Sequence, residues 1–150
     1  DFNLEELLSE SIEEARLTAT DYNITLHEGE TIHIHADRDK VGQVISNLLS
    51  NAVKYSPRGK SIELFFKTVD NMAVVSIKDE GMGIKPQDID KLFERYSRIE
   101  SKHTQNISGF GIGLYLCSEI IQRHEGKIWV ESEKGKGSTF HFNLPLSLEQ

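Results

Sequence analysis

One stretch in the first half of the chain constrains the fold more than any other. It runs from Asp37 to Pro57 and reads D-R-D-K-V-G-Q-V-I-S-N-L-L-S-N-A-V-K-Y-S-P. Asp37 is suited to cap a helix, and Pro57 predicts the helix end because a proline pushes the preceding residue, Ser56, out of the helical region. Apolar residues recur at helical spacing between these limits, which predicts one buried face. They are Val41, Val44, Ile45, Leu48, Leu49 and Ala52.

A polar ridge lies beside this apolar stripe. Asn47, Asn51 and Lys54 follow one another at helical spacing, and Tyr55 lies between the ridge and the stripe. An asparagine offers a neutral oxygen to a hard cation, and a lysine offers a mobile positive charge to phosphate. Asparagines at the rim of a helix are more often simply solvated, so the ridge alone does not establish a site.

The composition limits the possible partners. Hydrophobic residues make up 37% and charged residues 27% of 150 residues, as in one soluble globular domain. The net charge of −7 argues against nucleic acid or an anionic membrane as the main partner, but it leaves a phosphate ligand possible. The single cysteine, Cys117, suits a reducing compartment. No apolar run is long enough to span a membrane and no signal peptide is visible. We therefore expect a cytoplasmic fragment of a longer protein, without direct membrane contact.

The remaining elements predict a two-layer fold. Three main helices alternate with about five longer strands, which favours an α+β sandwich with the helices on one face of a mixed, mostly antiparallel sheet. No repeat or linker divides the chain, so we expect one domain over 1–150. Besides the helix described above, we expect helices over 3–19, 86–94 and 111–124, the last stopped by Gly126. We expect short strands over 24–27 and 31–35 around a turn at Gly29, hairpins over 61–68 with 72–79 and 127–133 with 138–144, and a loop over 95–110.

The strand expected over 72–79 ends in a carboxylate. Its alternation places Ala73, Val75, Ile77 and Asp79 on one side, and the apolar members require that side to face the helices. Burying the Asp79 carboxylate without a partner would be costly. A ligand with an N–H donor, such as the exocyclic amine of adenine, would satisfy it. The alternative is an ordinary glycine-containing turn capped by Asp79, and both interpretations stay open on this stretch alone.

Two groups of glycines add to this picture. Gly81 and Gly83 follow Asp79 at positions where a ligand ring could lie against the backbone. The run S-G-F-G-I-G-L over 108–114 leads directly into a helix, where closely spaced glycines expose backbone amides that suit phosphates. Its spacing is G-x-G-x-G after a polar loop rather than G-x-G-x-x-G after a strand, so a Rossmann dinucleotide site is excluded.

Four motifs together resemble the four boxes of sensor histidine kinases. They are N-L-L-S-N-A-V-K-Y-S-P, D-E-G-M-G, F-E-R-Y-S-R and G-F-G-I-G-L, in the order and approximate spacing of that family. Each box alone is a weak signal, but the ordered set is highly specific and covers nearly the whole chain. The chain is similar to the catalytic and ATP-binding domain of that family, within the GHKL superfamily. The resemblance implies a domain that binds ATP and Mg²⁺.

The resemblance also implies roles for the first two boxes. Asn51 matches the asparagine that binds magnesium, and Asn47 supports it from one turn earlier. Lys54 resembles the lysine that contacts phosphate, and Tyr55 resembles the aromatic residue beside adenine and ribose. Asp79 matches the carboxylate that reads adenine, with Gly81 and Gly83 making room for the base. In relatives that hydrolyse ATP the position of Asn47 is a glutamate base, so an amide there fits transfer to a histidine.

The last two boxes correspond to a lid over the nucleotide in the family. Phe93 would anchor the base of the lid, and Arg98 resembles the arginine that reaches the terminal phosphate. Catalysis would therefore rest on Asn47, Lys54 and Arg98. The final box would hinge the lid and cradle the phosphates through Gly109, Phe110, Gly111, Ile112, Gly113 and Leu114.

None of the six histidines lies in the context of the family's phosphoacceptor, which is followed by an acid and then a proline. We therefore expect the acceptor on a separate helical dimerisation domain of the same protein, with a response regulator downstream and a parent protein possibly anchored in the inner membrane. One alternative is a nucleotide-responsive binding module, a degenerate kinase domain that signals by ordering its lid. Another is a serine kinase of the anti-sigma type, which the F-E-R-Y-S-R box disfavours.

Overall fold

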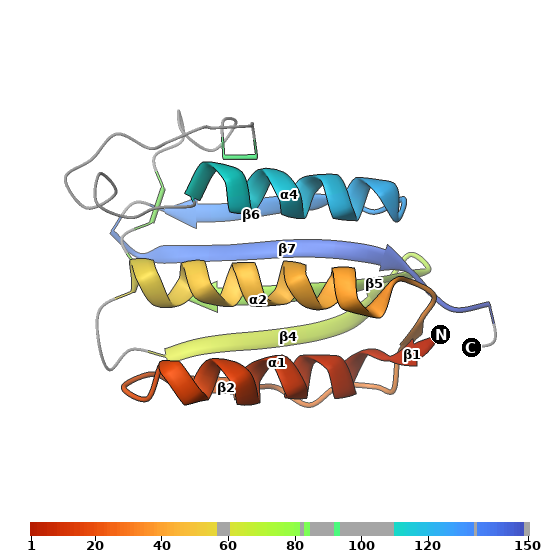
Figure 1. Cartoon of the computed structure of the whole chain (residues 1–150), viewed down its shortest axis with the longest axis horizontal. Coiled ribbons are helices and arrows are strands. Elements are labelled where there is room, and N and C mark those ends of the chain that lie inside the picture. Colours follow the sequence, from red (N-terminus) through yellow and green to blue (C-terminus); the bar gives the residue numbers. More distant parts are fainter. Residues whose placement is uncertain (57–60, 82, 85–91, 94–109, 134, 149–150) are drawn as a thin grey trace.

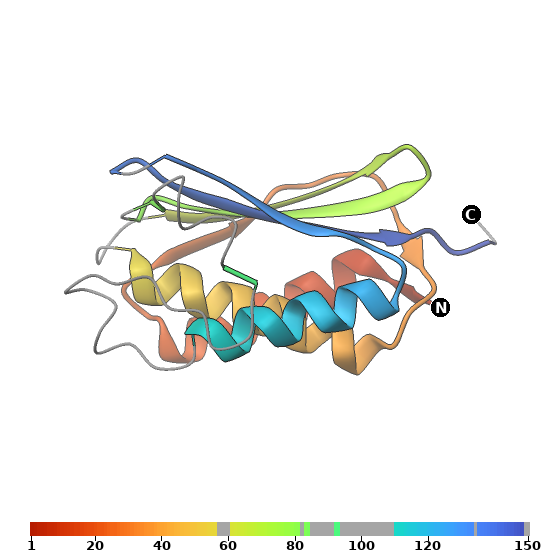
Figure 2. The same ribbon diagram turned by 90° about the horizontal axis from the view of Figure 1, so that it is seen from above.

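In the part of the chain that the structure describes, three helices cover one face of a sheet (Figure 1). The computed structural model describes residues 1–56, 61–81, 83–84, 92–93, 110–133 and 135–148. Viewed from above, the helices form one layer and the strands the other (Figure 2). The predicted α+β sandwich is confirmed. No helix in the described part of the chain is long and apolar enough to cross a membrane.

The first helix, α1 (Leu4–Thr18), begins directly after Asn3, where the predicted helix starts. The side-chain oxygen of Asn3 accepts hydrogen bonds from the backbone N–H groups of Glu5 and Glu6 at 2.9 and 3.4 Å. These donors have no partner inside the helix, so the cap fixes where the helix starts.

The central helix, α2 (Arg38–Tyr55), has the limits that the sequence predicts. Asp37 Oδ1 accepts the backbone N–H groups of Asp39 and Lys40 at 3.1 and 3.2 Å. At the other end Ser56 is extended, with φ −104° and ψ 142°. The apolar stripe of α2 is buried as predicted, each side chain being at most 4% exposed.

The five-stranded sheet has the order β2-β4-β5-β7-β6. The two predicted hairpins are present, and Asp70 and Asn71 form the tip of the first with φ of 50° and 64°. Positive φ at both central residues is the geometry of the tight hairpin turn that matches strand twist. The strands are β2 (Asn23–Leu26), β4 (Ser61–Val69), β5 (Met72–Asp79), β6 (Ile128–Glu133) and β7 (Gly137–Pro145).

The two early strands belong to different sheets. The two short strands around Gly29 do not pair with each other: β2 runs parallel to β4, and β3 (His33–Ile34) pairs with β1 (Phe2–Asn3). The physical reason is α2, which lies between β2 and β4 in the chain. It carries the chain back to the end where β2 starts, so the next strand runs in the same direction. The strand β1 was not predicted.

The core fills the space between the layers. On β5 the residues Ala73, Val75 and Ile77 are each 1% exposed and belong to this core, which confirms the predicted inward side, while Val74 is buried outside it. On α4 (Phe110–Arg123) the buried stripe consists of Leu114, Cys117 and Ile121. Gly113, Ile120 and His124, on either side of this stripe in the sequence or between its members, are half-buried.

The predicted role of Gly126 as a helix-stopping glycine is wrong in its detail. The left-handed residue at the end of α4 is Glu125, with φ 64°. The backbone N–H groups of Glu125 and Gly126 donate to the carbonyls of Gln122 and Ile121, which is the Schellman pattern. Position 126 needs glycine for another reason, because a Cβ there would lie 1.9 Å from the carbonyl oxygen of Asn143 on β7.

Two predictions fall largely outside the described residues. They are the short helix over 86–94 and the loop over 95–110. From these segments the structure describes Leu92 and Phe93, which belong to a turn, and Phe110, where α4 begins.

Candidate functional site

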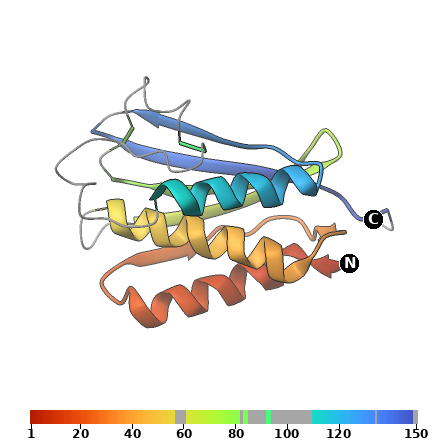
Figure 3. The ribbon, with the colours of Figure 1, turned by 45° about the horizontal axis from the view of Figure 1, so that its top comes forward.

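Three element ends that carry the predicted site residues lie at the same end of the molecule. The C-terminal ends of α2 and β5 and the N-terminal end of α4 meet there, and both chain termini lie at the opposite end (Figures 1 and 3). Residues separated by some thirty positions of sequence are therefore neighbours in space. The topology brings the first, second and last boxes of the sequence together.

Asp79, at the end of β5, is 5% exposed. Its Oδ1 accepts the backbone N–H of Gly81 at 2.8 Å and that of Ser138 at 3.2 Å. Within the described residues Oδ2 accepts no hydrogen bond. Burial raises the pKa of Asp79, and the two backbone hydrogen bonds partly oppose that rise. Among the residues that the structure describes, one carboxylate oxygen is thus fixed by the backbone, and the other can still accept a donor.

A serine pair that the sequence did not reveal holds this region together. Ser132 on β6 accepts the backbone N–H of Ile84 at 2.7 Å, and its Oγ lies 2.7 Å from the Oγ of Ser138. Ser132 Oγ also donates to the carbonyl of Gly137 at 3.1 Å. Asp79 pairs with Ser138 across β5 and β7, and knowledge of this register would have pointed to both serines. The sequence could not supply it, because the register between strands that are far apart in the chain is not a local sequence signal.

Gly81 and Gly83 are required by different constraints. A Cβ on Gly81 would lie 2.3 Å from the carbonyl oxygen of Tyr55 and 2.9 Å from Asp79 Oδ1. Gly81 therefore lets the end of β5 pack against the end of α2. Gly83 has φ 72°, a left-handed conformation that favours glycine. The expectation that these glycines leave space for a ligand ring stays a prediction.

The polar ridge of α2, formed by Asn47, Asn51 and Lys54, leads along the helix toward this end of the molecule. Asn47 is half-buried, Asn51 is 7% exposed, and Lys54 is exposed. Among the described residues the Nδ2 of Asn51 is buried without a hydrogen-bond partner. An unpaired buried amide group is costly, which points to a ligand as its partner. Burial raises the pKa of Tyr55 to about 12, so its phenol keeps its proton.

The remaining predicted residues are described only in part. The ring of Phe93 packs edge-on against Phe140 of β7, with 6.3 Å between centroids. Leu114 is fully buried, and Gly113 has no atom within 4 Å of the place where a Cβ would be. The backbone of Phe110, Gly111 and Ile112 forms the first residues of α4. Arg98 and Gly109 lie outside the described residues.

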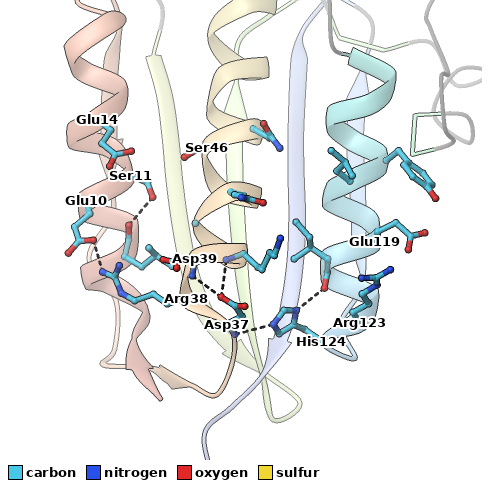
Figure 4. Close-up of a pocket in the computed structure, with 18 residues that line it drawn as sticks. Glu10, Ser11, Glu14, Asp37, Arg38, Asp39, Ser46, Glu119, Arg123 and His124 are labelled. Carbon is cyan, nitrogen blue, oxygen red and sulfur yellow. Dashed lines mark hydrogen bonds and ion pairs between the residues drawn. The ribbon is translucent and has the colours of Figure 1, made fainter.

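A separate groove crosses the helical face between α1 and α4 (Figure 4). It has a volume of about 1090 Å³ and is rich in charged residues, among them Glu10, Arg38 and Glu119. Of the predicted site residues whose side chains the structure describes, only Asn47 lines it. The candidate site is therefore the cluster at the end of the sheet and not this groove.

The cluster combines three chemical functions. A buried carboxylate can accept an N–H donor, an amide side chain can coordinate a cation or bind a phosphate oxygen, and a helix N-terminus attracts negative charge. An exposed lysine on the neighbouring turn adds a mobile positive charge. Such a combination suits a ligand with an aromatic amine at one end and phosphates at the other.

Comparison with known proteins agrees with this chemistry. Residues 36–148 match the sequence profile of the family described as histidine kinase-, DNA gyrase B-, and HSP90-like ATPase. The chain is 39% identical over 121 residues to the sensor histidine kinase WalK of Bacillus subtilis, covering 79% of this chain and 20% of that protein. It is 38% identical over 153 residues to the adaptive-response sensory kinase SasA of Thermosynechococcus vestitus, covering 96% of this chain and 38% of that protein.

Solved structures agree as well. The mycobacterial sensor histidine kinase MprB superposes with a TM-score of 0.83 at 27% identity, over 97% of both chains. The catalytic domain of the histidine kinase ThkA superposes with a TM-score of 0.81 at 28% identity, over 96% of this chain and 93% of that one. The chain therefore belongs to the histidine kinase-, DNA gyrase B- and HSP90-like ATPase family, as an ATPase domain of the kind found in the sensor kinases of two-component systems.

Proposed function

We propose that this domain binds ATP with magnesium and presents the γ-phosphate to a histidine on a separate helical domain. The observation that carries the proposal is the buried Asp79, whose Oδ1 is held by two backbone N–H groups and whose Oδ2 accepts no hydrogen bond in the described part of the chain. The exocyclic amine of adenine is a donor that would satisfy Oδ2.

The residues present suit a magnesium site at the other end of the ligand. Asn51 is a buried side chain whose amide has one end without a partner among the described residues. The two ends of an amide have nearly the same shape, so that end can donate to a phosphate oxygen or, when the amide is turned, coordinate a cation. Magnesium keeps several waters and takes few protein ligands, which fits one neutral amide here. When bound, the ion would neutralise charge on the phosphates.

Each of the other site residues would act by position or charge. Lys54, exposed on the last turn of α2, can bring its ammonium group to the phosphates. Arg98 would reach the terminal phosphate, Phe93 would support the lid through its contact with Phe140, and the start of α4 would direct backbone N–H groups at the phosphates. Asn47 carries no base that could activate water, which favours transfer to a protein acceptor over hydrolysis.

We further propose that the domain is one part of a longer sensor kinase. The chain spans 20% of WalK and 38% of the SasA of Thermosynechococcus vestitus. A dimerisation and phosphoacceptor domain, a downstream response regulator and a cytoplasmic location of this domain belong to the proposal. A nucleotide-responsive module without kinase activity is the second candidate, and transfer to an added acceptor domain separates the two.

A calorimetric titration tests nucleotide binding directly. The domain is titrated with a non-hydrolysable ATP analogue, with and without Mg²⁺, and Asn51→Ala is measured beside the wild type. We expect magnesium to strengthen binding to the wild type and to have little effect on Asn51→Ala, because the variant lacks the amide. A wild-type domain that binds no nucleotide would refute the proposed function. An Asn51→Ala variant with full magnesium dependence would refute the assignment of Asn51.

A further inference from the structure

Tyr22 lies between α1 and β2, outside every sequence box, yet it contacts the end of α2. Its hydroxyl lies 2.8 Å from the carbonyl oxygen of Ser56 and 3.0 Å from that of Val53. A phenol has one hydrogen to donate, so the two carbonyls share it. Tyr22 thus caps the C-terminal end of α2 from outside the helix.

The sequence of α2 explains why this end needs an external donor. In an α-helix the carbonyl of residue i accepts the backbone N–H of residue i+4, so the partner of Val53 would be residue 57. Residue 57 is proline and has no N–H to give. The final carbonyls of a helix lack intrahelical partners in any case. The hydroxyl of Tyr22 supplies the donor that the chain cannot supply locally.

The last turn of α2 carries the residues expected at the phosphates. Lys54 lies in that turn and Asn51 lies one turn before it. The same turn also touches the neighbouring box, because the carbonyl oxygen of Tyr55 packs against Gly81. Asp79, by contrast, is fixed by its own hydrogen bonds from Gly81 and Ser138. A donor to the helix end therefore acts on one half of the cluster more than on the other.

We propose that Tyr22 is a positioning residue for the phosphate and magnesium end of the nucleotide site. It acts through the last turn of α2, whose carbonyls it holds, and makes no contact with the ligand itself. The inference rests on the proposed function, since it assigns Tyr22 to the same site. It predicts that removing the hydroxyl alone weakens the binding of ligands that carry phosphates and leaves the binding of the adenine end unchanged.

A matched control exists in α1. The hydroxyl of the buried Ser11 donates to the carbonyl of Leu7 at 2.9 Å, a bond of the same kind and length as that of Tyr22. This bond lies within α1, and no hydrogen bond of the Ser11 hydroxyl reaches α2 in the described part of the chain. Tyr22→Phe and Ser11→Ala therefore each remove one hydroxyl that donates to backbone carbonyl groups, but only the first removes a cap of α2.

The experiment titrates wild type, Tyr22→Phe and Ser11→Ala with ATP in the presence of Mg²⁺ and with adenosine. Losing a hydrogen bond of this kind corresponds to roughly 3- to 10-fold in an equilibrium constant. We expect Tyr22→Phe to bind ATP with magnesium weaker by about that factor, and to need more Mg²⁺ for half-saturation. Adenosine affinity should stay within about twofold, and Ser11→Ala should match the wild type for both ligands.

A second measurement does not depend on any ligand. Amide hydrogen exchange of the peptide that covers the last turns of α2 should be faster in Tyr22→Phe than in the wild type, and unchanged in Ser11→Ala. Wild-type ATP affinity or unchanged exchange in Tyr22→Phe would overturn the inference while leaving the proposed function intact. If Tyr22→Phe loses as much affinity for adenosine as for ATP, or if Ser11→Ala loses the same ATP affinity, the contribution of Tyr22 is merely structural. Either result would also overturn the inference. A wild-type domain that binds no ATP would instead refute the proposed function.

Discussion

Burial raises the pKa of the Asp79 carboxyl group, so the folded state holds this proton more tightly than the unfolded state does. Above the ordinary pKa of a carboxyl group, the folded state therefore keeps a proton that the unfolded state has lost. The free energy of unfolding consequently falls as the pH rises through this range. At neutral pH the ionised Asp79 weakens the free domain. A residue that lowers the stability of the free fold is expected at a functional site, where a ligand requires it.

Asp79→Asn should separate these two effects. The amide oxygen can still accept the backbone N–H groups of Gly81 and Ser138, while the buried charge is removed. We expect the free domain to unfold at a higher temperature at pH 7, with a smaller difference between pH 5 and pH 7. ATP should bind more weakly by about 2 kcal/mol, because an N–H group then faces the amine of adenine. Thermal unfolding and calorimetry check both results, with the exposed Asp70→Asn as the control. Lower stability together with unchanged ATP affinity would contradict the assignment.

At the scale of elements, local chemistry predicts where structure begins and ends. Asn3 and Asp37 cap α1 and α2 as the sequence indicates, because a capping side chain bonds to N–H groups two and three residues away. The two hairpins are also predictable from local sequence, because their turn residues join strands that are adjacent in the chain. The partner of β2 could not be predicted, since it is chosen by where α2 returns the chain and not by residues near β2.

Part of the site was predictable on the same terms. The alternation of β5 predicts that Asp79 faces the helices, and the ridge of α2 predicts that Asn47, Asn51 and Lys54 share one side. The contribution of Ser132 was not predictable, because its bonds depend on the register of β6, β7 and the chain after Gly83. The same holds for Tyr22, whose partners on α2 are 31 and 34 residues away.

Ser132→Ala tests whether β6 supports the site. The change leaves the buried N–H of Ile84 without its acceptor and removes the partner of the Ser138 hydroxyl. An unsatisfied buried group costs about 1–3 kcal/mol, so we expect lower stability in chemical denaturation and weaker binding of adenosine and ATP alike. Ser76→Ala is the control, because the Ser76 hydroxyl bonds to His141 on the other face of the same sheet. If both variants lose nucleotide affinity equally, the link from Ser132 to the site is wrong.

At the scale of the whole molecule, the candidate site lies apart from the histidines that the structure describes. His33 lies in β3, the strand that pairs with β1 near the chain termini, and His35 follows it, with its ring bonded to Asp1. His124 lies beyond the far end of α4, where its Nε2 accepts the backbone N–H of Asp37. His141 lies on the face of the sheet away from the helices, stacked on Trp129.

This separation predicts that the domain binds ATP but does not phosphorylate itself. Phosphoryl transfer requires the acceptor nitrogen in line with the γ-phosphate, a geometry that a rigid sheet and its helices cannot give these histidines. Incubation of the domain with radiolabelled ATP should therefore leave no acid-labile label on the chain. His27 is held by stacking on Phe65 and by Glu63, on β4. His103 lies outside the described residues. The labelling experiment is therefore repeated with His103→Gln, which removes this histidine as an acceptor.

The positive half of the same prediction supplies the missing acceptor. Adding a helical domain from a relative that carries a histidine followed by an acid should place label on that domain, because only a docked partner can bring a nitrogen to the γ-phosphate. The rate should rise with the concentration of the added domain until docking saturates. Asn51→Ala should lower this transfer without unfolding the chain, which ties the label to the proposed magnesium site. Label that appears on the isolated chain, and disappears in a variant of one of its own histidines, would show that donor and acceptor lie within one domain.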